Sequence, residues 1–314
     1  MPAPERLPAA GVSTVTGIEE LLAEGELTVL GRIPQASNAV LLCTVTRDGA
    51  GVECVYKPVK GERPLWDFPD GNLARRERAA YLVSEATGWG LVPPTVLRDG
   101  PYGEGMVQLW LDAAGGAPEG EGVEGGEATD ESGAGGGPDT EAAAGPEPIG
   151  GPPGASLLAL VDGEEAGEGW RPVAFAEVGE GRTALLVHAD DERLRRLAVL
   201  DAVINNGDRK GGHLLPTPDG RLYGIDHGVS FHTDDKLRTL LWGWAGEPLT
   251  EEALTVLGRL SGELAEGGPL ATRLAELITG AELDAVRARV AALLAARTHP
   301  SPSGEWPPIP WPPV

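Results

Sequence analysis

The most informative part of the sequence reads Asn205-Asn206-Gly207-Asp208-Arg209-Lys210-Gly211-Gly212-His213-Leu214-Leu215 and continues, after a short gap, as Gly224-Ile225-Asp226-His227-Gly228. Two short apolar runs, 213–215 and 222–225, flank the residues 216–220, which contain two prolines and a glycine. Apolar runs joined by such turn-forming residues predict a small β-hairpin. The stretch therefore predicts a hairpin with one carboxylate, Asp208 or Asp226, at each end.

Phosphoryl transfer needs a pair of carboxylates, because one orients the acceptor's hydroxyl while another holds the magnesium ion. In kinase sequences a first Asp is followed two positions later by Lys and five later by Asn, and a second Asp begins the triplet Asp-Phe-Gly. Here Asp208 is followed at these positions by Lys210 and His213, and the triplet is Asp226-His227-Gly228. Each short motif taken singly is also ordinary turn chemistry. Their shared order and spacing favour the catalytic interpretation.

The patterns Asn-x-x-Asp-Arg at 205–209 and Ile-Asp-x-Gly at 225–228 resemble phosphatidylinositol 3- and 4-kinases more closely than ordinary protein kinases. The whole string is similar to an uncharacterised actinobacterial family in that branch of the protein-kinase-like superfamily. The resemblance implies an α+β, bilobal fold with an antiparallel N-lobe and a mainly helical C-lobe, and ATP and Mg²⁺ between the lobes. It also implies that Asp208 orients the acceptor hydroxyl, Lys210 offsets charge on the transferred group, and Asp226 chelates magnesium.

An upstream lysine and glutamate fit the same pattern. Lys57 ends an apolar strand, and Glu77 lies on a largely apolar face of the helix expected over 72–87. A carboxylate on such a face is costly unless it is paired. Lys57 is the natural partner, as in the Lys-Glu ion pair that orients nucleotide phosphates in kinases. Arg75, Arg76 and Arg78 remain alternative partners, and a solvent-exposed strand-end lysine is the alternative for Lys57.

Other contacts to the nucleotide are indicated only by position. Ser37 and Asn38 lie between two expected strands, where a nucleotide-covering loop would stand, but the segment lacks the usual glycines, so an ordinary strand connection is equally compatible. Gln108 and Trp110 precede the expected hinge between the lobes, where adenine commonly binds. All four residues are therefore candidates for binding ATP.

His213 departs from the kinase pattern, which has Asn at this position. Neutral imidazole is a poorer magnesium ligand than an amide oxygen. His213 is thus a candidate metal ligand beside Asp226, and two alternatives stay open: Asn205 or Asn206 compensates, or only one metal binds. The departure puts the rate of any reaction in doubt.

Composition and patterning suggest four parts. We expect an N-terminal kinase-like lobe at 11–111, a disordered acidic insertion rich in Gly, Ala and Pro at 112–156, a helical catalytic lobe at 157–298, and a Pro- and Trp-rich tail at 299–314. The insertion has almost nothing to bury. The tail favours polyproline II and would dock either on its own domain or on a partner.

The formal net charge of -23 disfavours a nucleic-acid partner, because phosphate backbones are bound by clustered Lys and Arg. No run approaches the apolar length of a membrane span, and the start lacks a secretory pattern, so a cytoplasmic protein without a transmembrane segment is expected. Its two cysteines do not imply a disulfide framework.

Three functions remain. The first is an ATP- and Mg²⁺-dependent kinase acting on a protein or small-molecule hydroxyl. The second is a phosphoinositide lipid kinase, which the acidic charge and a segment at 229–249 poor in basic residues disfavour. The third is a nucleotide-binding regulator without turnover, a pseudokinase, which His213 and the weak phosphate loop favour.

Overall fold

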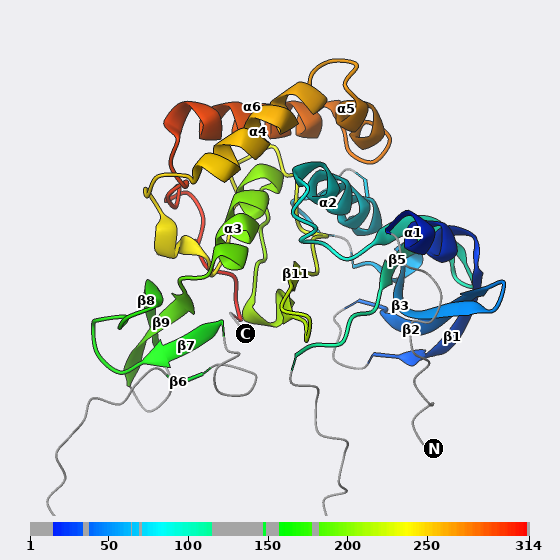
Figure 1. The fold of residues 1–314 in the computed structure, drawn as a ribbon, viewed down its shortest axis with the longest axis horizontal. Helices are drawn as coiled ribbons and strands as arrows, with labels where there is room; N and C mark the ends of the chain where they lie inside the picture. Colours follow the sequence, from blue (N-terminus) through cyan, green and yellow to red (C-terminus); the bar gives the residue numbers. More distant parts are fainter. Residues whose placement is uncertain are drawn as a thin grey trace, which may run out of the picture.

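The computed structural model describes residues 15–33, 38–63, 65–68, 71–114, 147–148, 157–177 and 182–312. A β-rich lobe and a lobe built mainly of helices lie side by side, as Figure 1 shows. Within the described ranges, no helix combines the length and the apolar character that crossing a membrane requires.

The N-terminal lobe is a five-stranded antiparallel sheet in the order β1-β2-β3-β5-β4. Its strands are β1 (Glu26–Arg32), β2 (Leu41–Arg47), β3 (Ala50–Pro58), β4 (Thr95–Gly100) and β5 (Gly103–Leu109). The tight turn between β2 and β3 has positive φ at Asp48 (53°) and Gly49 (80°), the backbone that matches the twist of a hairpin. Helix α1 (Val15–Glu24) buries Leu21 and Leu22 against the sheet, where they meet Cys43 and Val45.

Helix α2 (Leu73–Thr87) lies between the sheet and the helical lobe (Figure 1). Its start is well capped: the Asn72 side chain accepts a hydrogen bond from the Arg75 amide, and the Glu62 carboxylate accepts from the amides of Leu73 and Ala74 at 2.9 and 2.8 Å. These acceptors satisfy N–H groups that have no partner inside the helix. The helix ends at Gly88, whose φ of 71° closes it in a left-handed conformation.

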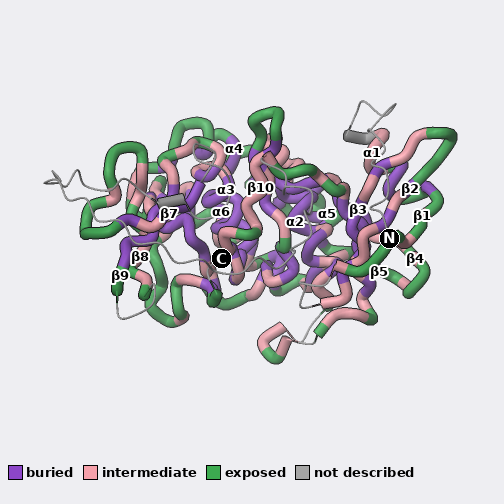
Figure 2. The backbone as a smooth tube through the Cα atoms, turned by 90° about the horizontal axis from the view of Figure 1, so that it is seen from below, coloured by how far each residue is buried: buried purple, intermediate pink, exposed green. Residues whose placement is uncertain are grey.

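The C-terminal lobe packs α2 against four further helices in one hydrophobic core. These are α3 (Glu192–Ile204), α4 (Glu251–Glu263), α5 (Pro269–Leu274) and α6 (Gly280–Ala296). In Figure 2 the buried segments run through the middle of this lobe, around α2, α3 and α6, while the peripheral loops are exposed. Helices α5 and α6 are separate, because a capping box between Thr279 and Glu282 starts a new helix there.

A second sheet, which the sequence did not reveal, precedes α3. It is antiparallel and four-stranded, in the order β6-β7-β9-β8. Its strands are β6 (Glu147–Pro148), β7 (Leu158–Val161), β8 (Trp170–Glu177) and β9 (Thr183–Ala189). Strand β6 lies inside the segment expected to be disordered, yet it pairs with β7. The remainder of that segment, apart from 112–114, is outside the described residues.

The expected hairpin is present as β10 (Leu214–Pro216) and β11 (Leu222–Gly224). Short 3-10 turns lie at η1 (Val59–Gly61), η2 (Gly211–His213) and η3 (Trp242–Trp244). The C-terminal tail docks on its own chain: the Pro308 carbonyl accepts from the Thr239 amide at 3.0 Å and from the Trp242 indole at 2.8 Å. The chain thus has the two-lobed α+β arrangement of a protein-kinase-like fold, as expected, with an added sheet in the C-terminal lobe. The exact lobe boundaries stay a prediction.

Candidate active site

Lys57 stands near the end of β3, and its ammonium group pairs with Glu77 of α2. The Nζ to Oε1 distance is 2.9 Å, and the Glu77 side chain is 4% exposed. The carboxylate therefore sits in the core with its charge compensated, as the apolar face of α2 predicted. Of the competing arginines, Arg76 pairs with Glu282, Arg78 with Glu19 and Arg75 with Glu104. The expected Lys57–Glu77 partnership is what the structure contains.

Asp226 follows strand β11 and bonds to the same ammonium group, since the Nζ of Lys57 donates to its Oδ1. The charge of Lys57 is the main reason why the pKa of Asp226 lies far below its usual range. Burial works against the charge of Lys57, but Asp226 and Glu77 outweigh it and raise its pKa. Lys57 and Asp226 are therefore both ionised at neutral pH.

Asp226 has a left-handed backbone, with φ of 59°. A non-glycine residue rarely adopts this conformation unless its surroundings hold it there. The neighbouring amide of His227 donates to the second oxygen of Glu77 at 3.0 Å. Glu77 thus contacts both the lysine and the backbone that carries Asp226.

Asp208 lies in the loop between α3 and the hairpin, with Lys210 beside it. The Lys210 Nζ is 3.1 Å from an Asp208 oxygen, and both side chains are partly exposed. The loop is held from below, because the Asn206 side chain accepts from the Asp208 amide at 3.0 Å and donates to Asp201 at 2.9 Å. Asp201 thus holds this loop through Asn206.

His213, in the turn η2, lies close to Asp226. Its Nε2 is 3.5 Å from an oxygen of Asp226. Burial lowers the pKa of His213 more than the nearby carboxylates raise it, so the imidazole is neutral, and its Nδ1 accepts from the Lys210 amide at 3.5 Å. Among the described residues, no group of three or more His, Cys, Asp or Glu side chains is arranged to hold a metal.

The asparagines do not replace the missing amide ligand. The Asn205 side chain donates to the carbonyls of His232 and Asp234 and accepts from the Lys236 amide. That of Asn206 is used by Asp201 and Asp208. Both amides have structural partners inside the loop, so the alternative in which they compensate for His213 is not supported.

A cavity of about 250 Å³ joins these groups. Lys57, Glu77, Asp208 and Asp226 all line it, together with Asn38. The Asn38 side chain is also tied to the N-terminal lobe, since its oxygen accepts from the Arg63 amide at 3.1 Å. Five of the expected site residues, from both lobes, therefore face one cavity.

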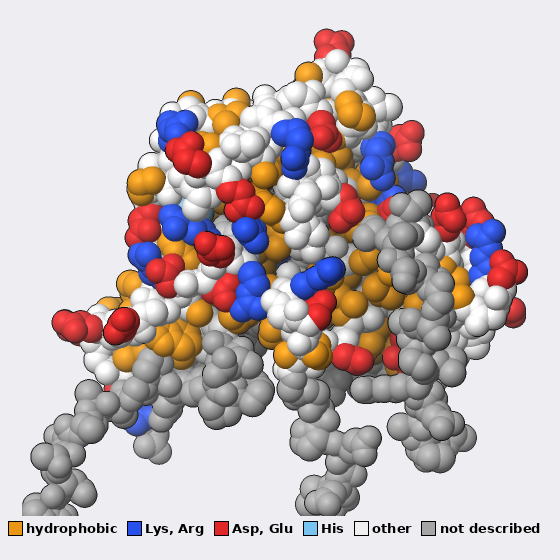
Figure 3. Space-filling model, viewed as in Figure 1, with side chains coloured by type: hydrophobic (Ala, Val, Ile, Leu, Met, Phe, Trp, Pro, Cys, Tyr) orange, Lys and Arg blue, Asp and Glu red, His pale blue; other side chains and the backbone are white. Residues whose placement is uncertain are grey.

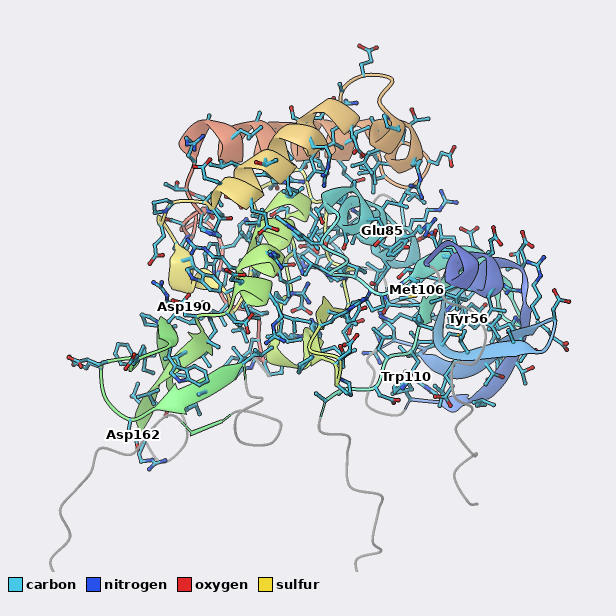
Figure 4. The ribbon with its side chains drawn as sticks, in the orientation of Figure 1. Tyr56, Glu85, Met106, Trp110, Asp162 and Asp190 are labelled. Carbon is cyan, nitrogen blue, oxygen red and sulfur yellow. The ribbon has the colours of Figure 1, made fainter. Side chains whose placement is uncertain are left out.

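The remaining candidates do not line this cavity, or lie outside the described part of the chain. Ser37 falls outside it. Gln108 is buried and donates to the Thr95 hydroxyl at 2.8 Å, so its side chain is occupied within the sheet. Trp110 lies where the chain leaves β5 (Figure 4), and it is not among the residues that line the cavity. Contacts from Gln108 and Trp110 to adenine stay a prediction.

Sequence reasoning missed the buried side chains that support the site. Arg209 and His227 are both fully buried and bond to each other, with 2.7 Å between Nη2 and the imidazole Nε2. A second missed contact is the buried Lys236, which pairs with Asp67 at 2.8 Å. No local sequence pattern predicts that a charged residue in a loop is buried, because the residue that pairs with it comes from a distant part of the chain.

Comparison with known proteins gives one relative with clear sequence similarity and several solved structures with weak similarity. No family model matches the chain. It is 48% identical over 292 residues to Protein Rv2133c of Mycobacterium tuberculosis, covering 93% of this chain and 94% of the relative.

The chain belongs to the family of Protein Rv2133c. Among solved structures it is similar to the Golgi casein kinase with Mn/ADP bound (TM-score 0.48, 13% identity, covering 90% of this chain and 75% of that one). It is also similar to hydra Fam20 with sugar (TM-score 0.47, 14% identity, 92% and 90%). No residue role follows from either likeness.

Proposed function

We propose that this protein is an ATP- and divalent-metal-dependent phosphotransferase that acts on a hydroxyl of a protein or small molecule. The observation that carries the proposal is the convergence of Lys57, Glu77, Asp208 and Asp226 on one cavity between the lobes. Phosphoryl transfer depends on positioning and on charge stabilisation, and these are the groups that it requires. We also propose that it belongs to the branch of kinases that includes the phosphatidylinositol 3- and 4-kinases, which its sequence motifs resemble.

In this proposal Lys57 binds the phosphates of ATP and is oriented by Glu77. Asp226, with His213 beside it, holds the metal. One carboxylate with substrate phosphates and water is a sufficient ligand set for Mg²⁺ or Mn²⁺, and the ionised state of Asp226 fits this role. The bound metal would neutralise charge on the transferring phosphate.

Asp208 accepts a hydrogen bond from the acceptor hydroxyl and takes up its proton. The hydroxyl oxygen forms a bond to the terminal phosphorus of ATP while the bond from that phosphorus to the bridging oxygen breaks, and ADP leaves. Lys210, 3.1 Å from Asp208, places a positive charge beside the transferred group.

A second candidate is a nucleotide-binding regulator without turnover. His213 in place of the usual asparagine favours it. The direct bond between Lys57 and Asp226 also favours it, because this bond would have to break before Lys57 could bind the nucleotide and Asp226 the metal. A phosphoinositide kinase is less favoured. On the face drawn in Figure 3, Lys and Arg are interspersed with Asp and Glu, and no broad basic patch is visible there for an anionic lipid surface.

The test is transfer of labelled phosphate from ATP by the full-length protein, with Mg²⁺ or Mn²⁺. Separate reactions contain phosphoinositide vesicles, a protein lysate, or no acceptor. Label in protein supports the first candidate, label in lipid the phosphoinositide kinase, and saturable ATP binding without transfer the regulator.

Two variants sharpen this test. Asp208→Asn is expected to abolish transfer, and transfer at the wild-type rate would contradict the role of Asp208. Asp219→Asn is the matched control, because Asp219 lies in the turn of the same hairpin and its partners in the described part of the chain, Thr217 and Arg221, belong to that turn. It is expected to keep wild-type transfer.

A further inference from the structure

Arg209 is a buried cation near the site that makes several hydrogen bonds. Its Nε and Nη2 donate to the two oxygens of Asp201, both at 2.9 Å, and Arg209 and Asp201 are both 0% exposed. The paired geometry is the strong, two-pronged form of an arginine–carboxylate bond. Asp201 lies on α3, so this ion pair fastens Arg209 to the centre of the C-terminal lobe.

The guanidinium also contacts the residues on either side of Asp226 in the chain, Ile225 and His227. Its Nη1 donates to the carbonyl of Ile225 at 3.0 Å and lies 3.3 Å from the carbonyl of His213. Its Nη2 lies 2.7 Å from Nε2 of His227. The residues before and after Asp226 are therefore both bonded to one buried side chain.

The contact with His227 fixes the state of the imidazole. An arginine N–H can only donate, so Nε2 of His227 must accept, which requires the neutral ring with its proton on Nδ1. His227 is fully buried, and its backbone amide donates to Glu77 at 3.0 Å. His227 thus links the arginine on one side to the Lys57–Glu77 pair on the other.

Close packing of the backbone shows that the guanidinium fits its place tightly. A Cβ added at Gly224 would lie 2.9 Å from Nη2 and 3.2 Å from Nη1 of Arg209. Strand β11 can approach the guanidinium only because this residue has no side chain. The arginine is therefore held by its bonds and also by the strand that leads into Asp226.

We propose that Arg209 is a positioning residue for both aspartates of the site, and that it holds the left-handed backbone of Asp226 through Ile225 and His227. Asp208 is its immediate chain neighbour, so the same anchor on α3 fixes where the two carboxylates stand relative to each other. The consequence for metal and nucleotide binding rests on the proposed function, whereas the consequence for the backbone does not.

The first test uses amide hydrogen exchange of the full-length protein without ligands. His227→Phe keeps the ring volume and removes the acceptor, so Arg209 is left with an unpaired buried N–H. We expect exchange in 225–229 to become at least tenfold faster while exchange in α4 and α6 is unchanged. Wild-type exchange in 225–229 would overturn the proposal.

Two comparisons separate positioning from a general loss of stability. His227→Gln offers an amide oxygen to Arg209 and is expected to restore exchange to within about threefold of wild type. His299→Phe is the matched control, because His299 is also buried and its Nε2 lies 3.3 Å from Nε of Arg195, away from the site. It should leave exchange in 225–229 unchanged, and faster exchange there in this variant would contradict the proposal.

A second variant is used if His227→Phe does not form a folded state that unfolds cooperatively. Arg209→Lys keeps a positive charge for Asp201 but cannot reach Ile225 and His227 at the same time. We expect it to speed exchange in 225–229 at least tenfold, and wild-type exchange would overturn the proposal.

The binding test uses Mn²⁺ with a non-hydrolysable ATP analogue. His227→Phe is expected to weaken Mn²⁺ binding in the presence of the analogue at least tenfold, and to add no further loss in an Asp226→Ala background. Unchanged Mn²⁺ affinity would contradict positioning of Asp226. If the wild-type protein binds neither probe while the exchange result holds, the positioning role stands and the proposed function falls.

Discussion

Lys57 connects two of the carboxylates that line the cavity. Its ammonium group contacts Glu77, which α2 supplies, and Asp226, which follows the hairpin. Because Lys57 belongs to the N-terminal sheet and Asp226 to the C-terminal lobe, their ion pair also links the lobes electrostatically. If either acid is removed, the other one alone balances the positive charge of Lys57.

At the residue scale, Glu77→Gln removes the charge that orients Lys57 while keeping nearly the same shape. The amide can still accept from His227, but Lys57 is left to pair with Asp226 alone. We expect phosphate transfer to fall by at least tenfold, with a higher KM for ATP. Initial rates over a range of ATP concentrations measure this.

The control for that prediction is Glu104→Gln. Glu104 makes an exposed ion pair with Arg75 at 3.4 Å in the same lobe, and exposed pairs contribute little. This variant should keep the wild-type rate. A Glu77→Gln variant as active as the control would show that the Lys57–Glu77 pair has no role in transfer.

His213 leads to a prediction about metal preference. An imidazole nitrogen suits Mn²⁺ better than Mg²⁺, whereas an amide oxygen suits Mg²⁺. We expect the wild-type protein to be more active with Mn²⁺, and His213→Asn to lower the Mn²⁺/Mg²⁺ ratio of kcat/KM by about threefold or more. An unchanged ratio in parallel assays with the two metals would show that His213 is not a ligand.

At the scale of elements, Lys236 ties three segments together. It lies in the segment after the Asp226 triplet and pairs with Asp67 of the N-terminal lobe at 2.8 Å. Its Nζ also lies 4.4 Å from the ring centre of Trp306 in the tail and 5.4 Å from that of Trp66. Cations over aromatic faces are stabilised electrostatically. The tail therefore helps to hold the segment that follows the site.

Lys236→Met tests this arrangement, because it keeps much of the stem and removes the charge. Asp67 then loses its partner in a partly buried place, and we expect a loss of about 2 kcal/mol in the free energy of unfolding. Urea denaturation measures it. The matched control is Arg47→Met, which removes the exposed pair with Glu24 and should cost less than about 0.5 kcal/mol. Equal losses in the two variants would refute a structural role for Lys236.

At the scale of the whole molecule, acid sensitivity follows from two buried histidines that lie beside Trp244. The ring centres of His188 and His299 lie 4.3 and 6.1 Å from that of Trp244. Burial lowers the pKa of each histidine to about 4. His188 accepts at Nε2 from the Gly243 amide, a bond that requires the neutral ring.

The sign of the pH effect follows from these values. An unfolded histidine has a pKa of about 6.5, so between roughly pH 6.5 and 4 the unfolded state binds more protons than the folded one. Stability is therefore full above this window and is lost as the pH falls through it, by up to roughly 3 kcal/mol for each histidine. Urea titrations at pH 7 and pH 5 measure the loss.

The control for the pH prediction is a variant with the acid-sensitive group removed. His299→Phe should be less stable at pH 7 yet lose less than the wild-type protein between pH 7 and pH 5. An identical loss in both proteins would show that His299 does not titrate in this window.

The sequence by itself determined the helix after Lys57, the hairpin after Asp208 and the identity of the acidic and basic groups at the site. The helix at 72–87 and the hairpin after Asp208 follow from local rules, and so does the need of Glu77 for a partner: helices have a 3.6-residue period, and a carboxylate on an apolar face is costly alone. These rules act over a few residues, so they can be applied without the fold. The choice of Lys57 as that partner came from the resemblance to kinases, and the structure contains the pair.

Only the tertiary structure decided how the site is held. The bonds of Arg209 to Asp201 and His227, the second sheet before α3 and the docking of the tail through Pro308 join segments that are distant in sequence. Their energies depend on which groups lose water together, and that depends on long-range packing. The local sequence around a charged residue in a polar loop therefore does not distinguish a side chain exposed to solvent from one buried in the core.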